Sequence, residues 1–168
     1  MNIIDKYFIE FGEEQRPMAA SVESLTYCAH MIESNKIKNI LDSGSGLSSA
    51  FFHSKFSNVI TVDHDPYWAN KTRSFISSHI NKHINIESIT QLISNKFEFV
   101  FYDYGNIETR IFYFKQALEL CTRFLYVDDM HVSYYSDYVK TKSRQYELNI
   151  IPETMDQYGR YGAMIVKQ

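Results

Sequence analysis

The 168-residue sequence has few cysteines and no long apolar run. Its two cysteines, Cys28 and Cys121, are far apart and lack metal-site spacing, so we expect two buried thiols in a reducing compartment. No segment approaches the apolar length of a membrane span, and the acidic, interrupted N-terminus does not resemble a signal peptide. We therefore expect a cytoplasmic protein without membrane partners.

Basic clusters, linkers and repeats are also absent. The formal net charge is −3 and no run of Lys or Arg occurs, which argues against a nucleic-acid partner. The length suits one domain with a sizeable core. We expect a single domain over residues 1–168, with an N-terminal helical segment over 1–35 and a sheet with its helices over 36–168.

Aromatic residues, in contrast, are abundant, with 13 Tyr and 12 Phe. This content favours an aromatic-rich core, and the alternative is a stacking surface for a ring-bearing substrate.

Apolar periodicity predicts strands that alternate with helices. The predicted strands cover 37–41, 59–62, 84–86, 97–102, 124–127, 147–151 and 163–166. Helical patterns cover 1–16 (ended by Pro17), 21–33, 47–55, 66–79, 89–93, 107–120 and 133–144. The pattern predicts an α/β fold with a doubly wound, mostly parallel sheet. The last two strands lack an intervening helix, so we expect a C-terminal antiparallel pair at one edge.

A glycine turn is the most informative local feature. A short apolar strand ends on Asp42 and enters a turn containing Gly44 and Gly46. Two glycines at this spacing allow a tight turn and a close approach to a ligand. Ser48 and Ser49 then open a helix whose free N–H groups face that ligand. A carboxylate here would repel a pyrophosphate, but it suits a cofactor with an ammonium and a sulfonium, such as S-adenosylmethionine.

Acidic residues end four of the predicted strands, at Asp42, Asp63, Asp103 and the pair Asp128-Asp129. One such residue is typically a surface group or a helix cap. Four in register crowd negative charge into one cleft at the carboxyl edge of the sheet. We therefore expect a positive group among them.

The second strand supplies the candidate nucleoside contacts. Asp63 follows the glycine turn by roughly twenty residues, where an acid accepts the ribose hydroxyls of a nucleoside. His64 and Trp68 flank it and are candidates to line the adenine, with core packing as the alternative for Trp68. Ser88 is a candidate for the adenine edge. Dinucleotide binding is the rival, but Ser49 stands where the third glycine of that motif belongs.

Three segments together resemble class I S-adenosylmethionine-dependent methyltransferases, over about residue 21 to the C-terminus. They are Asp42-Ser43-Gly44-Ser45-Gly46-Leu47-Ser48, Val62-Asp63-His64-Asp65-Pro66 and Phe101-Tyr102-Asp103-Tyr104-Gly105. The resemblance implies a Rossmann-like seven-stranded sheet with one reversed strand and the cofactor over the first two strands. It implies that Gly44 and Gly46 contact the methionine portion, Asp42 orients its ammonium, and Asp63 holds the ribose. The full set of candidate cofactor-binding residues is Asp42, Gly44, Ser45, Gly46, Ser48, Ser49, Asp63, His64, Trp68, Ser88, Asp103 and Tyr104.

A narrower resemblance, to catechol-type O-methyltransferases, implies a divalent cation such as magnesium held by Asp103, Asp128 and Asp129. Hard oxygen ligands suit this ion, which would hold and acidify a substrate hydroxyl. No lysine follows Asp103 to act as a base, and His131 is the natural candidate. Asp103, Asp128 and His131 are thus the candidate catalytic residues. The segment Asp-Asp-Met-His also resembles a small O-methyltransferase-like group in which metal dependence is not assured.

Aromatic and basic residues near the C-terminus have two interpretations. One interpretation is a substrate lid. The favoured one is that a helix and a turn pack on the sheet. The residues concerned are Tyr134, Tyr135, Tyr138, Tyr158, Arg160 and Tyr161. Arg110 and Arg160 either pair with the acids or bind an anionic substrate.

The sequence therefore predicts an enzyme that transfers a methyl group from S-adenosylmethionine to an oxygen of a small molecule or sugar. The proline-containing motifs of nucleic-acid amino-methylating enzymes are absent after Asp103. A homo-oligomer is compatible with the sequence. Two alternatives stay open: an enzyme that cleaves S-adenosylmethionine, and a non-catalytic binding module on the same fold.

Overall fold

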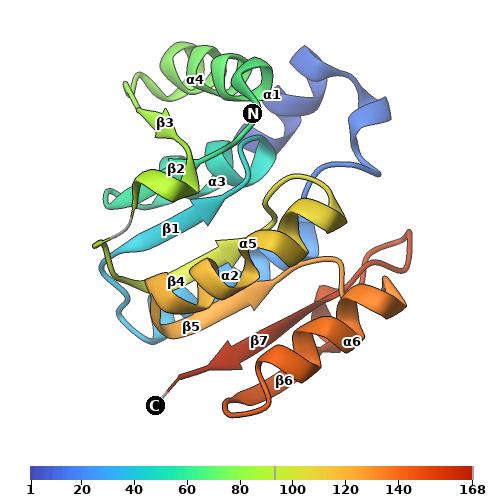
Figure 1. The fold of residues 1–168 in the computed structure, drawn as a ribbon. Helices are drawn as coiled ribbons and strands as arrows, with labels where there is room; N and C mark the ends of the chain where they lie inside the picture. Colours follow the sequence, from blue (N-terminus) through green and yellow to red (C-terminus); the bar gives the residue numbers. More distant parts are fainter. Residues whose placement is uncertain (93, 168) are drawn as a thin grey trace.

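The computed structural model describes residues 1–92 and 94–167, and these contain one seven-stranded sheet (Figure 1). Its strands are β1 (Ile40–Ser43), β2 (Val59–Val62), β3 (Ile86–Glu87), β4 (Phe97–Tyr102), β5 (Cys121–Val127), β6 (Glu147–Ile151) and β7 (Gly162–Val166). Their order is β3-β2-β1-β4-β5-β7-β6. Strand β7 runs antiparallel to both of its neighbours, β5 and β6, whereas the other strand pairs of this sheet are parallel. The seven-stranded sheet with a C-terminal antiparallel pair is confirmed.

Helices cover both faces of the sheet (Figure 1). They are α1 (Ile3–Phe11), α2 (Val22–Ser34), α3 (Leu47–Lys55), α4 (Pro66–Ile80), α5 (Ile107–Leu120) and α6 (Ser133–Lys142), with 3-10 turns at Glu13–Gln15, Ile89–Gln91 and Pro152–Thr154. Helices α1 to α4 pack on one face, and α5 and α6 pack on the other. Successive side chains of a strand point into the cores on opposite faces of the sheet, as Val100 and Phe101 of β4 do.

Aromatic side chains fill the hydrophobic cores on the two faces of the sheet, as expected. Tyr102 is fully buried with α5, whereas Phe101 stacks on Tyr126 with ring centroids 5.2 Å apart. Both cysteines are buried and unbridged. Burial raises the pKa of the Cys121 thiol to about 11, which keeps it protonated.

Several element boundaries differ from the sequence prediction; strand β5, for example, begins at Cys121 rather than at residue 124. The first helix ends at Gly12, whose φ of 94° breaks the helical path, rather than at Pro17. Strand β1 begins at Ile40 instead of residue 37, because the Asn39 side chain bonds β4 there, donating to the Lys96 carbonyl and accepting from the Glu98 amide. The helix expected over 89–93 is a single 3-10 turn, and Ile93 lies outside the described residues.

The chain direction places the carboxyl ends of β1 and β4 side by side at the switch point of the sheet. Strand β2 lies on one side of β1 and β4 on the other, which is the position where open α/β sheets form a ligand crevice. The Asp103 amide donates to the Ser43 carbonyl at 2.8 Å, which joins the two strand ends. Among residues 1–92 and 94–167, no helix is both long and apolar enough to cross a bilayer.

Candidate cofactor site

The turn after β1 forms a tight cradle. Gly44 adopts φ 107°, and a Cβ at this position would collide with the backbone carbonyl oxygen of Asp103. The Ser48 hydroxyl donates back to the Gly44 carbonyl at 3.2 Å, which closes the turn at the start of α3. Only glycine therefore allows β1 and β4 to approach this closely.

Asp42 lies beneath this turn and is completely buried. The hydroxyls of Ser49 and Thr61 both donate to its Oδ2, whereas its Oδ1 has no hydrogen-bond partner among the described residues. Burial raises the pKa of this carboxyl to about 7, against the opposing effect of the hydroxyl donors. Asp42 and Ser49 do not line the cavity described below. The structure therefore places Asp42 beneath the turn, where it links α3 to β2 through Ser49 and Thr61, and not at the cavity surface where it would contact an ammonium directly.

Asp63 ends β2 and faces the same turn. Its Oδ2 accepts from the Ser45 amide at 2.7 Å and from the Ser45 hydroxyl, and its Oδ1 accepts from the Asp65 amide at 2.9 Å. The carboxylate is thus fixed by backbone donors while it lines the cavity. This placement fits the ribose-binding role that the sequence suggests.

A cavity of about 410 Å³ opens over these residues. This volume lies in the range of small-molecule sites. Most of the predicted cofactor residues line it: Gly44, Ser45, Gly46, Ser48, Asp63, His64, Trp68 and Asp103. Ser88 and Tyr104 do not, because Ser88 caps the 3-10 turn after β3 and the buried Tyr104 hydroxyl accepts from the Ile89 amide at 3.3 Å.

The N-terminal segment forms the other wall of the cavity, which the sequence did not predict. Its contributions are Tyr7, Gln15, Met18, Ala19 and Ala20. Helical spacing in this segment indicated a buried face but not what that face covers. No local signal in the sequence links it to the glycine turn.

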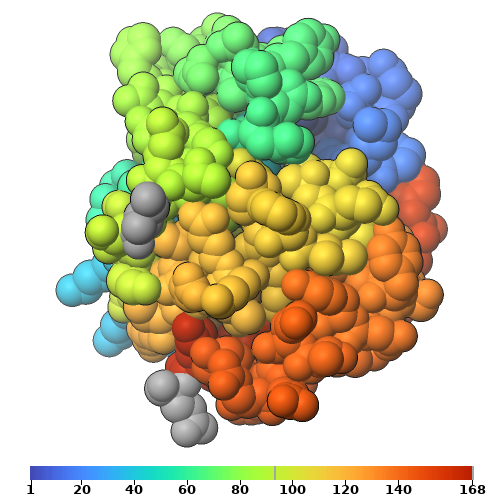
Figure 2. All heavy atoms as spheres, viewed as in Figure 1, coloured from blue at the N-terminus to red at the C-terminus, as the bar shows by residue number. Residues whose placement is uncertain are grey.

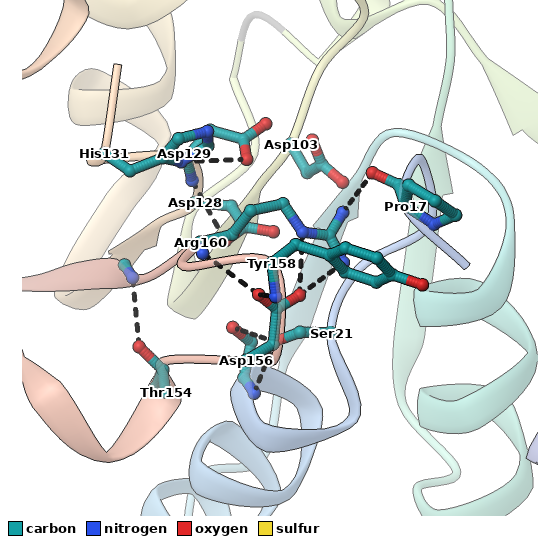
Figure 3. Close-up of polar contacts among 12 residues, drawn as sticks. Pro17, Ser21, Asp103, Asp128, Asp129, His131, Thr154, Asp156, Tyr158 and Arg160 are labelled. Atoms are coloured by element: carbon teal, nitrogen blue, oxygen red, sulfur yellow. Dashed lines mark hydrogen bonds and ion pairs between the residues drawn. The ribbon is translucent and has the colours of Figure 1, made fainter. Parts of the chain in front are cut away.

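Arg160 fixes this N-terminal wall from the opposite end of the chain. Its guanidinium donates to the carbonyl oxygens of Pro17 at 2.7 Å, Ala19 at 2.9 Å and Arg16 at 3.1 Å, and pairs with Asp156 at 2.6 Å (Figure 3). Figure 2 shows the loop after β6, in red, directly beside the N-terminal segment, in blue. Arg160 pairs with Asp156, which is not one of the strand-end acids that the sequence offered as its partners.

Arg110 lies among the acidic residues of the adjacent strand ends. Its Nη1 donates to Asp129 at 2.7 Å, and its Nη2 pairs with Asp103. Burial lowers the pKa of the guanidinium, but the two carboxylates outweigh burial and raise it above its ordinary value. Arg110 is therefore the positive group that the crowded carboxylates require.

The remaining carboxyl of this cluster, Asp128, accepts from the Asp129 amide at 3.0 Å. Burial raises its pKa to about 6, with the Asp129 charge adding and Arg110 opposing. His131 Nδ1 lies 3.6 Å from Asp129 Oδ1 (Figure 3). Asp103 lines the cavity, whereas Asp128, Asp129 and His131 do not.

The carboxylates do not fit the magnesium site suggested by the sequence. Arg110 already pairs with Asp103 and Asp129, two of the three expected ligands. Within residues 1–92 and 94–167, no group of three acidic, histidine or cysteine side chains has metal-binding geometry. A guanidinium occupies the position where the divalent cation was expected.

Two of the three tyrosines of α6 pack on the sheet and its helices. Tyr135 is completely buried, and the Tyr138 hydroxyl donates to the Ile111 carbonyl at 3.0 Å. Tyr134 is exposed, and its hydroxyl donates to Glu108 at 3.2 Å. The three tyrosines, Tyr158 and Tyr161 all lie outside the cavity lining. The packing interpretation therefore describes Tyr135 and Tyr138.

Comparison with known proteins supports the fold assignment. No family model and no curated protein matches the sequence. Among solved structures, an O-methyltransferase from Bacillus cereus in complex with SAH (S-adenosylhomocysteine) has a TM-score of 0.75 at 16% identity. The superposition covers 98% of this chain and 90% of that one.

Two further solved structures extend this comparison. A SAH-bound methyltransferase from Podospora anserina has a TM-score of 0.70 at 14% identity, covering 100% and 89% of the two chains. A magnesium protoporphyrin IX methyltransferase from Synechocystis with bound SAM has a TM-score of 0.65 at 12% identity, covering 100% and 85%. The chain therefore has the Rossmann-like fold of these methyltransferases.

Replacing Arg160 should release the N-terminal wall of the cavity. We expect Arg160→Ala to lower the free energy of unfolding by about 3 kcal/mol, because the buried Asp156 loses its partner and three carbonyls lose donors. Arg123→Ala removes an exposed pair with Glu98 and should cost less than about 1 kcal/mol. Urea unfolding measures both, and equal losses would contradict the anchoring role of Arg160.

Asp42→Asn should flatten the pH dependence of stability. Because its pKa is raised to about 7, Asp42 keeps its proton in the folded state up to about pH 7, whereas the unfolded chain releases the proton near the ordinary carboxyl pKa of 3.8. Stability from this group therefore falls as pH rises between these values, and the neutral amide removes that loss. Melting temperatures measured from about pH 5 to about pH 8 should decline less for Asp42→Asn than for wild type. Asp137→Asn, at an exposed position on α6, should keep the wild-type slope, and an unchanged slope for Asp42→Asn would exclude a raised pKa.

Proposed function

We propose that this protein binds S-adenosylmethionine in the cavity at the β1–β4 switch point and transfers its methyl group to an oxygen of a small molecule. The observation that carries this proposal is the Gly44 cradle with Asp42 beneath it and Asp63 opposite. The solved structures of similar fold that contain SAH or SAM support the proposal.

Each part of the cavity suits one part of this cofactor. The first-turn amides of α3 and the glycine backbone suit the methionine end, and the Asp63 carboxylate suits the ribose hydroxyls. His64 and Trp68 supply flat side chains for the adenine. When bound, the cofactor supplies an electrophilic methyl group on a positively charged sulfur.

The acidic cluster beyond the cradle supplies the candidate acceptor side of the site. Asp103 lines the cavity near Arg110 and Asn106. Transfer to a hydroxyl requires a group that takes its proton. Of the predicted catalytic residues, Asp103 lines the cavity, whereas Asp128 and His131 lie at the same edge outside its lining. Asp103 is therefore the candidate that an acceptor in the cavity can reach, and a role for Asp128 or His131 requires an acceptor that extends beyond the cavity.

Replacing Asp63 should weaken cofactor binding. We expect Asp63→Ala to lower the affinity for S-adenosylhomocysteine at least about tenfold, since a carboxylate with charge-assisted hydrogen bonds contributes about 1.5–3 kcal/mol. Isothermal titration calorimetry measures this, with the exposed Asp137→Asn as a control that should bind like wild type. Equal affinities of Asp63→Ala and wild type would remove Asp63 from the site.

A product assay separates transfer from the alternatives. We expect S-adenosylhomocysteine to accumulate only when a hydroxyl-bearing small molecule is supplied with S-adenosylmethionine. Mass spectrometry of the mixture with and without acceptors measures this. Breakdown of S-adenosylmethionine without any acceptor would establish a cleaving enzyme instead, and absence of cofactor binding would leave a non-catalytic module. Fold alone does not distinguish these activities.

A further inference from the structure

Arg110 is built into the acidic edge of the site by three kinds of contact. The side chain is 9% exposed, and its Nε donates to the Gly105 carbonyl at 3.1 Å. Its Nη1 donates to Asp129 at 2.7 Å, and its Nη2 pairs with Asp103. A buried guanidinium is tolerated only with such partners, and both carboxylates that pair with it are themselves only partly exposed.

The backbone that carries Arg110 is also fixed. Its amide donates to the Asn106 carbonyl at 2.9 Å in the first turn of α5, and its carbonyl accepts from the buried Tyr102 hydroxyl at 2.7 Å. Arg110 is thus held from both β4 and α5. This placement aims the guanidinium at the carboxyl ends of β4 and β5.

The position of Arg110 coincides with the centre of the expected metal site. Asp103 and Asp129, two of the residues expected to share a divalent cation, share the guanidinium instead. Arg110 also lines the cavity, together with Asp103 and Asn106. Its contacts with Gly105, Asp103 and Asp129 occupy three of the five N–H donors of a guanidinium.

We propose that the Arg110 guanidinium replaces a divalent cation at this site, so that the protein works without metal and presents N–H donors to the acceptor oxygen. This inference rests on the proposed function. A bound divalent cation would lower the pKa of a substrate hydroxyl, whereas a guanidinium supplies N–H donors, singly or as a bidentate pair.

The proposal is tested with metal alone as the probe, on the full chain. After chelator treatment, the wild-type melting temperature should stay the same in millimolar Mg²⁺ or Mn²⁺ as in chelator. Arg110→Ala leaves Asp103, Asp128 and Asp129 without their cation, so its melting temperature should be lower in chelator. Either metal should then raise it by about 4 °C or more. The double variant Arg110→Ala/Asp103→Asn should lose this response.

Two controls make the result specific. Arg123→Ala removes an arginine that pairs with Glu98 away from the cavity, and its melting temperature should not respond to metal. If Arg110→Ala does not fold, calorimetric titration of Mg²⁺ into wild type decides the question. Saturable binding of Mg²⁺ to wild type that Asp103→Asn abolishes would overturn the proposal, as would an Arg110→Ala variant that folds without any metal response.

Activity gives a second readout. The rate of methyl transfer by wild type to any acceptor that it accepts should be the same in chelator as in millimolar Mg²⁺. A loss of activity in chelator that Mg²⁺ restores would contradict the proposal. Binding of S-adenosylhomocysteine, measured in parallel, separates failure of the proposed function from failure of the Arg110 proposal. Absence of binding would contradict the proposed function, whereas the effect of metal on the melting temperature of Arg110→Ala tests Arg110 alone.

Discussion

The crowding of carboxylates at one edge of the sheet is the constraint on which the site depends. Parallel strands bring their carboxyl ends together, and several of these strands end on aspartate. Each carboxylate is compensated differently. Hydroxyl donors serve Asp42, backbone amides serve Asp63, and the Arg110 guanidinium serves Asp103 and Asp129. Asp42 Oδ1 is the exception, because it has no hydrogen-bond partner among the described residues and lies buried beneath the glycine turn.

The local parts of this arrangement were predictable from the sequence. A strand that ends on Asp42 before two closely spaced glycines has few structural solutions, and the collision that a Cβ on Gly44 would cause shows why. The strand–helix alternation likewise predicted the sheet, because central strands buried on both faces are continuously apolar. The need for a positive group among the acids followed from electrostatics alone.

The identity of that group was not predictable, because it depends on contacts between distant segments. Arg110 enters the cluster from α5, in the first turn after its N-cap Asn106, and nothing in its neighbouring residues distinguishes it from a surface arginine. Contacts between distant segments also explain why the sequence did not predict that the N-terminal segment lines the cavity. Arg160 bonds carbonyls more than 140 residues earlier in the chain, a contact that periodicity and motifs do not encode. Metal ligation was expected from a resemblance to catechol-type O-methyltransferases and from the oxygen ligands of the aspartates. In the structure Arg110 pairs with Asp103 and Asp129, two of the three expected ligands.

The proposed site therefore combines a glycine turn built by backbone geometry with an acidic strand edge at which Arg110 pairs with two aspartates. The most direct test is a crystal structure of the protein soaked with S-adenosylhomocysteine. The account predicts density in the cavity with the ribose on the Asp63 carboxylate and the amino acid end over the Gly44 turn. Density elsewhere, or an empty cavity at saturating ligand, would contradict it.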